Sequence, residues 1–185
     1  PYKCLEKEDD HVRLCRVNAK NKKAIEYVGS RPTGGATQLM LLQKEGLKKN
    51  DYVLEIGSGG LVTGIPIMSF LEKEHYVGID PNAWLMHDTL TIDENRKIVE
   101  KTHPHFLQRE DFNAEDTGIS FDYIFAHSIM SHAAKWQLNL FLRNCARVLK
   151  KGGKVIFSMR LTEPNEYGNE GARDETRTHR WVYPG

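Results

Sequence analysis

Residues 52–82 constrain the fold of this chain more than any other stretch. Their sequence, YVLEIGSGGLVTGIPIMSFLEKEHYVGIDPN, predicts a buried strand, a glycine-rich turn, a helix and a second buried strand that ends on Asp80. Gly57 and Gly59 carry no Cβ, so the backbone of the turn can approach a ligand closely. Asp80 follows Gly57 by 23 positions, near the spacing of about 20 expected for a carboxylate that binds ribose hydroxyls. The stretch therefore predicts half of a nucleotide-binding α/β fold.

Length and charge limit the class of protein. At 185 residues the chain suits one domain that buries about 70% of its unfolded surface. A formal charge of +1 provides no global field for nucleic acid or anionic membrane. No apolar run approaches the roughly 20 residues of a membrane span, and we expect no signal peptide.

The cysteines indicate a compartment. Cys4, Cys15 and Cys145 are odd in number and lack metal-ligand spacing, which favours a reducing environment. No His, Asp or Glu cluster has metal-ligand spacing either, so we expect no metal. We therefore expect a soluble, cytoplasmic protein.

Strands and helices alternate along the chain, which predicts a doubly wound, mostly parallel sheet with helices on both faces. Lys150-Lys-Gly-Gly is expected to cap the last helix, and Arg31-Pro-Thr-Gly-Gly to break the chain before the first. The predicted helices span residues 36–47, 61–74, 83–101 and 136–149, and the predicted strands span residues 52–56, 76–79, 106–108, 121–126 and 155–159.

We predict one domain over residues 1–185. A charged N-terminal lead (1–35) precedes a cofactor-binding core (36–160), and a polar loop with a sixth strand at Trp181-Val-Tyr follows it (161–185). The fold we expect lacks the last strand or strands of a complete sheet. An open sheet edge can pair with a second copy, so a homodimer is one assembly to test.

Five segments in order carry a family resemblance: VLEIGSGG, YVGIDPN, REDF, FDYIFAHS and RVLKKGGKVIFS. From Ala36 to Arg160 the chain resembles class I S-adenosylmethionine-dependent methyltransferases, which have a Rossmann-like fold. Val62 stands where a dinucleotide-binding loop has its third glycine, the one that allows close helix–strand packing beside a pyrophosphate. Its absence suits a cofactor without phosphates and disfavours a nicotinamide-dependent oxidoreductase.

The resemblance implies where S-adenosylmethionine binds. The loop from Glu55 to Gly60 holds the methionine part, with Glu55 toward the amino group, directly or through water. Asp80 binds the ribose hydroxyls, and Asp111 accepts from the adenine amino group. The implied cofactor-binding residues are Glu55, Gly57, Ser58, Gly59, Asp80, Asn82, Asp111, Phe112 and His127.

Several of these residues also have structural interpretations. Asp80 can cap the helix that begins near Ala83, and Asp111 can cap a turn with Asn113. Phe112 either offers its backbone N–H to the adenine, packs beside the ring, or belongs to the core. Gly57 and Gly59 can form a tight turn without any ligand.

The implied reaction is methyl transfer by in-line displacement, in which the protein mainly aligns nucleophile and methyl group. His127 and His132 are the candidate catalytic residues, one of them as a base where the acceptor is a hydroxyl. They lie five positions apart, so a helix would not place them on one face.

The acceptor class follows from what is missing. Base-modifying amino-methyltransferases often carry Asn/Asp-Pro-Pro-aromatic after the fourth strand, where this chain has AHSI. The basic clusters are short, and no aromatic and basic patch is present for stacking bases. A small-molecule acceptor is therefore favoured over nucleic acid. A non-catalytic, cofactor-binding or regulatory subunit that needs a partner is the first alternative, and a nucleic-acid or protein methyltransferase is the second.

Overall fold

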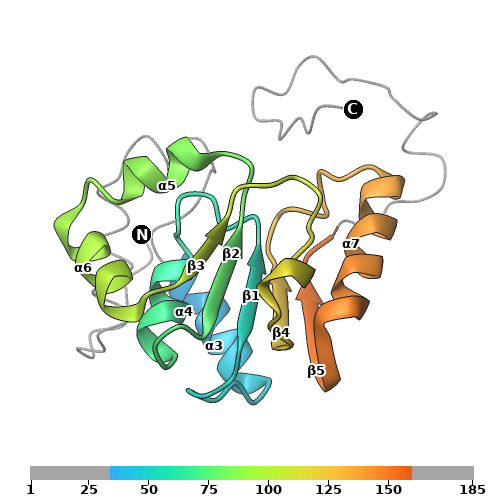
Figure 1. The fold of residues 1–185 in the computed structure, drawn as a ribbon, viewed down its shortest axis with the longest axis horizontal. Coiled ribbons are helices and arrows are strands. Elements are labelled where there is room, and N and C mark those ends of the chain that lie inside the picture. Colours follow the sequence, from blue (N-terminus) through green and yellow to red (C-terminus); the bar gives the residue numbers. More distant parts are fainter. Residues whose placement is uncertain (1–33, 160–185) are drawn as a thin grey trace.

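The computed structural model describes residues 34–159 and contains a five-stranded sheet (Figure 1). The strands pair in the order β3-β2-β1-β4-β5, and every pair is parallel. Because the chain places β4 beside β1, on the side away from β2, the order reverses there and the carboxyl ends of β1 and β4 flank a topological switch point. The strands are β1 (Val53–Ile56), β2 (Tyr76–Ile79), β3 (His105–Leu107), β4 (Phe121–Ala126) and β5 (Leu149–Phe157).

Helices cover both faces of this sheet, which confirms the predicted doubly wound fold class. One core cluster joins α3 and α4 to the face formed by Val53, Tyr76 and Tyr123, and the other joins α7 to the face formed by Leu54, Val77 and Ile124. Figure 1 shows α3 and α4 behind the sheet and η1 in front of it. The helices are α3 (Gly34–Lys44), α4 (Gly64–Phe70), α5 (Ala83–Thr89), α6 (Asp93–Thr102), η1 (Glu115–Thr117, a 3-10 turn) and α7 (Lys135–Val148).

The first helix begins earlier than predicted. Gly34 and Gly35 form the first turn of α3 and do not break the chain. A Cβ on Gly35 would lie 2.0 Å from the carbonyl oxygen of Val62, so this glycine allows α3 to approach the loop before α4. The helix ends at Lys44, and Gly46 follows it with a φ of +100°, a conformation that suits glycine.

The single helix predicted over residues 83–101 is wrong, since two helices, α5 and α6, occupy it. The buried hydroxyl of Thr89 donates to the Gly60 carbonyl (2.7 Å), and the Asn95 amide donates to the Thr89 carbonyl (3.3 Å). Thr89 thereby ties the end of α5 to the glycine loop, and α6 starts again at Asp93.

The predicted Lys150-Lys-Gly-Gly cap is also wrong. The chain becomes extended at Leu149 directly after α7, and these four residues form the start of β5. The register passes from Phe121 opposite Leu149 to Tyr123 opposite Lys154, so the glycines serve a bulge, where Gly152 has a φ of +84°.

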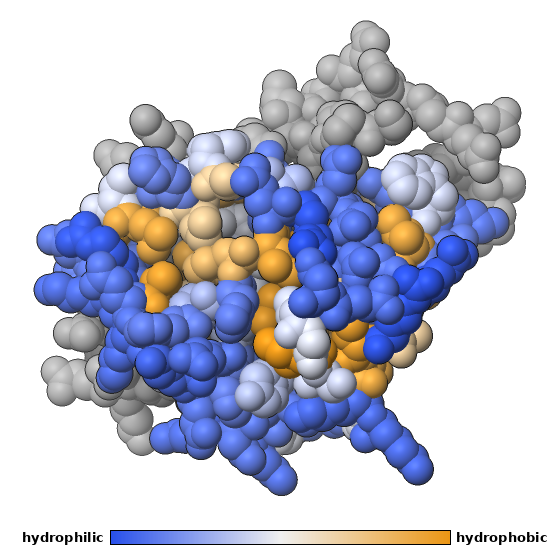
Figure 2. Space-filling view, in the orientation of Figure 1, coloured by the Kyte–Doolittle hydropathy of each residue, from blue (hydrophilic) through white to orange (hydrophobic). Residues whose placement is uncertain are grey.

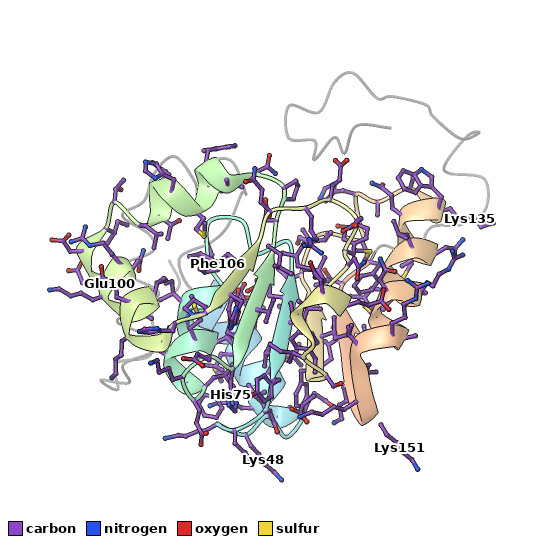
Figure 3. The ribbon with its side chains drawn as sticks, in the orientation of Figure 1. Lys48, His75, Glu100, Phe106, Lys135 and Lys151 are labelled. Carbon is purple, nitrogen blue, oxygen red and sulfur yellow. The ribbon has the colours of Figure 1, made fainter. Side chains whose placement is uncertain are left out.

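The face of the molecule seen in Figure 1 is mostly hydrophilic over α6 and α7. Apolar surface shows at the centre of this face, in front of the sheet (Figure 2). Lys48 and Lys151 point away from the sheet at its amino-terminal end, opposite the glycine loop (Figure 3). The predicted N-terminal lead, apart from Gly34 and Gly35, and the sixth strand at Trp181-Val-Tyr lie outside the described residues, as do Cys4 and Cys15.

Candidate functional site at the carboxyl edge of the sheet

The glycine loop between β1 and α4 is bound to the end of β2. The backbone N–H groups of Gly57 and Ser58 both donate to the Ile79 carbonyl, at 2.8 and 3.1 Å. Gly57 has a φ of +80° and Gly59 one of +42°, a region that glycine enters without a steric penalty. A Cβ on Gly57 would also come within 2.1 Å of the Ile129 side chain. Packing therefore requires this glycine even without a ligand.

Asp80 locks the loop in place from the tip of β2. Its carboxylate accepts from the Gly59 N–H at 2.9 Å and from the Asn82 N–H at 2.7 Å. Burial raises the pKa of Asp80, and these two backbone donors oppose the rise. A carboxylate has about four acceptor positions, so these two backbone bonds leave part of its acceptor capacity for a ligand. The predicted helix cap is wrong, because Asn82 occupies the cap position of α5 and Asp80 bonds the N–H of that residue, outside the helix.

Ser58 faces the sheet. It is buried, and a Cβ on Gly78 would lie 2.9 Å from its hydroxyl oxygen. The Ser58 side chain thus packs on β2 beneath the loop.

Glu55 lies under the same loop and pairs with Tyr76. Only 3% of Glu55 and 2% of Tyr76 is exposed, and the tyrosine hydroxyl donates to Glu55 Oε2 at 2.5 Å. Burial is the main cause that raises the pKa of Glu55 to about 8, and the charge of Asp80 adds to it, whereas the bond from Tyr76 opposes it. In the part of the chain that the structure describes, neither Glu55 nor Asp80 forms an ion pair. Two carboxyl groups without a cation suit a ligand that carries positive charge.

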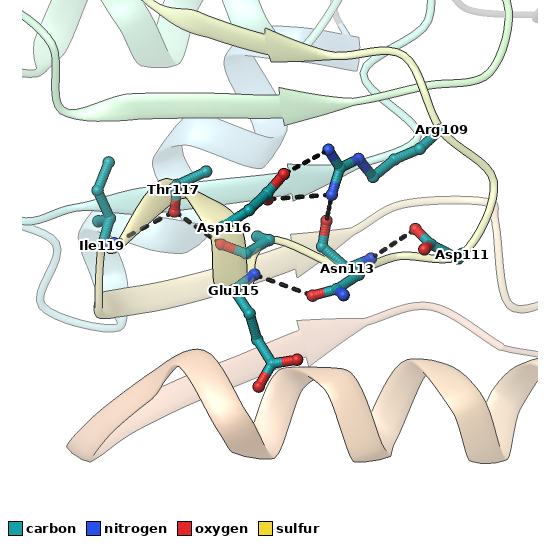
Figure 4. A network of polar contacts seen from close by, with 8 residues as sticks. Arg109, Asp111, Asn113, Glu115, Asp116, Thr117 and Ile119 are labelled. Atoms are coloured by element: carbon teal, nitrogen blue, oxygen red, sulfur yellow. Dashed lines mark hydrogen bonds and ion pairs between the residues drawn. The ribbon is translucent and has the colours of Figure 1, made fainter.

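Asp111 belongs to a polar network after β3 (Figure 4). Its carboxylate accepts from the Asn113 N–H at 3.1 Å, which is the turn that its structural interpretation predicts. Arg109 holds the same loop through two bonds to Asp116 (3.0 and 2.8 Å) and one to the Asn113 carbonyl. The Asn144 amide of α7 donates to the Asp111 carbonyl at 2.7 Å, so α7 helps to fix this segment.

Phe112 is a core residue. Its ring is 3% exposed and meets the ring of Phe141 edge to face, with centroids 6.1 Å apart. Its φ of +58° is rare for a residue with a side chain. The strained backbone turns the ring inward from the edge of the site, so packing of this ring beside an adenine is not supported.

His127 and His132 stand in a loop of bends and turns between β4 and α7, and this segment is not helical. The exposed ring of His127 stacks on Phe125, with centroids 6.4 Å apart and an angle of 8° between the rings. Desolvation lowers the pKa of His127. The loop is anchored by a bond from the Ser128 N–H to the Ser158 hydroxyl (2.7 Å), while the His132 N–H donates to the Ile129 carbonyl (3.0 Å).

The glycine loop, Asp80 and the residues after β4 therefore meet at the carboxyl edge, beside the switch point. A sequence profile of the family described as methyltransferase domain matches residues 54–155. That is more than half of the chain. The chain belongs to the methyltransferase-domain family. The resemblance to class I S-adenosylmethionine-dependent methyltransferases is thereby confirmed.

Solved structures similar to this methyltransferase domain are distant in sequence. BH2331, a proposed methyltransferase from Bacillus halodurans C-125, is 21% identical, with a TM-score of 0.56 over 71% of this chain and 54% of its own. DhpI, solved as a complex with SAM and HEP, is 15% identical, with a TM-score of 0.53 over 82% of this chain and 67% of its own. The glycopeptide N-methyltransferase MtfA, complexed with sinefungin, is 13% identical, with a TM-score of 0.57 over 70% of this chain and 55% of its own. This chain thus spans about half the length of BH2331 and MtfA, and these similarities establish the fold. No curated protein matches.

Two features of this methyltransferase domain escaped prediction from sequence. The sequence places Tyr76 in a strand but gives it no role. Once β1 pairs with β2, Glu55 lies opposite Gly78, and Tyr76 is two positions before Gly78 on the same face. The register of these two strands is therefore the signal that brings the tyrosine hydroxyl to the buried glutamate. The hydrogen bonds that link Gly60 to Thr89 and Thr89 to Asn95 have no signal in the sequence. They depend on how α5 and α6 pack against the glycine loop.

Residues 34–159 contain neither a metal-binding cluster nor a helix that could span a membrane. No group of three His, Cys, Asp or Glu side chains could hold a metal ion there. None of the helices in this range is long and apolar enough to cross a membrane. His75, which stacks on Tyr52 with centroids 4.0 Å apart, lies at the other end of the strands (Figure 3).

Proposed function

We propose that this methyltransferase domain transfers a methyl group from S-adenosylmethionine to a small-molecule acceptor by in-line displacement. The observation that carries the proposal is the glycine loop bound to Asp80 at the switch point of the sheet, within the segment that matches the methyltransferase-domain family. The SAM complex of DhpI and the sinefungin complex of MtfA, both with this fold, support it.

The residues present fit such a cofactor. Asp80 keeps free acceptor positions for ribose hydroxyls, and the positive-φ glycines bring bare backbone to the ligand. The uncompensated carboxyl groups of Glu55 and Asp80 suit a cationic amino-acid portion. Asp111 and the backbone N–H of Phe112 are proposed for the adenine edge. Both the backbone N–H and the side chain of Asn82 interact with the Asp80 carboxylate, so Asn82 is proposed as part of the cofactor site beside Asp80.

The bound cofactor supplies an electrophilic methyl group on a sulfonium. The chain's part is to hold the acceptor in line with that methyl and to exclude water. His127 is the first candidate for a base, because its lowered pKa favours the neutral ring, which can accept a proton. His132 is the second candidate, later in the same loop.

Binding and turnover test the proposal separately. Isothermal calorimetry should show that S-adenosylhomocysteine binds, and Asp80→Ala should weaken it at least tenfold, since the variant loses both the loop contact and the ribose acceptor. Asp93→Ala, at the exposed start of α6, is the matched control. Folded protein that binds neither S-adenosylmethionine nor S-adenosylhomocysteine would refute the proposal.

Turnover decides between an enzyme and a non-catalytic cofactor-binding subunit. S-adenosylhomocysteine formation is measured against a panel of small molecules, with a nucleic acid and a protein mixture as the other acceptor classes. Tight binding without turnover on any class would favour the regulatory alternative. We further propose a cytoplasmic location and pairing of two copies, which fractionation and light scattering would test.

A further inference from the structure

The hydroxyl of Tyr76 is fixed from two sides. Its ring meets Phe106 of the edge strand β3 edge to face, with centroids 6.2 Å apart, and Figure 3 labels Phe106 on this side of the sheet. Its oxygen donates to Glu55 Oε2 on the neighbouring strand β1. Because ring and hydroxyl are both held, Tyr76 sets the position of the Glu55 carboxyl group under the glycine loop.

The fold makes room for this contact at Gly64, the first residue of α4. A Cβ there would lie 2.6 Å from the Tyr76 hydroxyl and 3.3 Å from Glu55 Oε2. The absence of a side chain at this position therefore allows α4 to close over the pair.

Among the described residues of β2, β4 and α4, the charges around the pair are negative or neutral. β2 provides Tyr76 and, beyond its end, Asp80. β4 provides Phe125 opposite Glu55, followed by His127, whose lowered pKa favours the neutral ring. α4 has the sequence GIPIMSF and contributes no ionisable side chain. A buried carboxyl group beside a second carboxylate and without a cation favours its protonated form.

We propose that Tyr76 is a positioning residue for the cofactor's amino group: it holds the Glu55 carboxyl group, which releases its proton when the cationic ligand binds. The O–H bond of Glu55 breaks, the proton leaves for the solvent, and the carboxylate left behind pairs with the ligand ammonium while Tyr76 donates to it. This inference rests on the proposed function, in that the ligand is S-adenosylmethionine or its product.

The first measurement needs no cofactor. In protein labelled with carbon-13 at the glutamate carboxyl groups, the Glu55 signal is identified by its loss in Glu55→Gln and followed from pH 4 to pH 10. Its midpoint is expected near pH 8, in line with the pKa of about 8, and Tyr76→Phe should raise it. Tyr123→Phe is the matched control, because it loses a hydroxyl bond to the Glu45 carbonyl (2.9 Å) at the other end of the same face. A midpoint near 4.5 in the wild-type protein would overturn the inference.

The second measurement uses calorimetry with two ligands. S-adenosylhomocysteine carries the ammonium group, and methylthioadenosine lacks it. In buffers of different ionisation enthalpy, S-adenosylhomocysteine should release about 0.9 proton at pH 7, since a group with a pKa of about 8 is mostly protonated there. Tyr76→Phe should weaken S-adenosylhomocysteine about tenfold, because a hydrogen bond to a charged group is lost, and leave methylthioadenosine unchanged.

The outcomes separate the two proposals. Binding of S-adenosylhomocysteine without proton release, or with equal affinity in Tyr76→Phe, overturns this inference and leaves the proposed function standing. Absence of binding to protein whose Glu55 titrates near pH 8 overturns the proposed function and the coupling to it. Urea unfolding of each variant shows that both tyrosine substitutions are compared in folded protein.

Discussion

Gly64→Ala tests whether α4 closes over the Tyr76–Glu55 pair as the structure has it. The added Cβ would lie 2.6 Å from the Tyr76 hydroxyl oxygen, 3.2 Å from Cζ of the same ring and 3.3 Å from Glu55 Oε2. Contacts under 3.0 Å require movement, and the Tyr76 ring is fully packed at 2% exposure. Overpacking of this kind costs about 1–3 kcal/mol, so we expect Gly64→Ala to lower the free energy of unfolding by about 2 kcal/mol.

A double-mutant cycle with Tyr76→Phe shows how much of the cost of Gly64→Ala comes from the clash with the Tyr76 hydroxyl. Without the hydroxyl, the nearest ring atom is 3.2 Å from the new Cβ, a tight but tolerable contact. Gly64→Ala should then cost less than about 1 kcal/mol, or even stabilise the helix, since alanine favours helices over glycine by about 1 kcal/mol.

Urea unfolding of the wild type, the two single variants and the double variant measures the interaction energy. We expect a coupling of at least about 1 kcal/mol, in the sense that the double variant is more stable than the sum of the single effects predicts. Additivity within about 0.5 kcal/mol would refute the reasoning, because it would mean that the alanine methyl group and the tyrosine hydroxyl do not compete for the same space.

Three further predictions concern other buried groups. Because the pKa of Glu55 is raised to about 8, its contribution to stability is fully present below pH 4.5 and is lost as the pH rises toward 8. The free energy of unfolding should therefore fall with pH over this range, by at most about 1.4 kcal/mol per pH unit. Glu55→Gln should remove this pH dependence in urea titrations at several pH values. Thr89→Val should cost about 1–3 kcal/mol of unfolding free energy, since it leaves the buried Gly60 carbonyl without its donor. Thr91→Val removes an exposed hydrogen bond to the Asp88 carbonyl and should cost under about 0.5 kcal/mol in the same assay. Equal costs would contradict the role of Thr89 as an anchor. Burial raises the pKa of Cys145 to about 12, so peptide mass spectrometry should find it unmodified by iodoacetamide at pH 8 in native protein and modified in urea.

Strands and glycines were predictable because their signals are local. The apolar runs at residues 76–79 and 121–126 form β2 and β4 with the predicted bounds, since a buried parallel strand needs side chains that are apolar on both faces. The alternation of these runs with helical segments predicted the parallel sheet for the same reason.

Local signals failed where two distant segments meet. Lys150-Lys-Gly-Gly has the composition of a helix cap, but pairing with β4 draws the chain into the sheet and uses Gly152 in a bulge. The low helix propensity of threonine predicts only that a helix is weaker at Thr89. In the structure, the Thr89 hydroxyl bonds the Gly60 carbonyl at the residue where α5 ends, before α6 begins.

By itself, the sequence determined the fold class, the family and the place of the site, because glycine spacing and strand-end carboxylates depend on the covalent order of the chain. Tertiary structure decided what each group does there. It placed the Phe112 ring in the core and bound Asp80 to the Gly59 N–H. It also brought Tyr76 of β2 into contact with Glu55 of the neighbouring strand β1. Burial and hydrogen-bond partners control the charge of a carboxyl group, and both exist only once segments far apart in sequence have packed together.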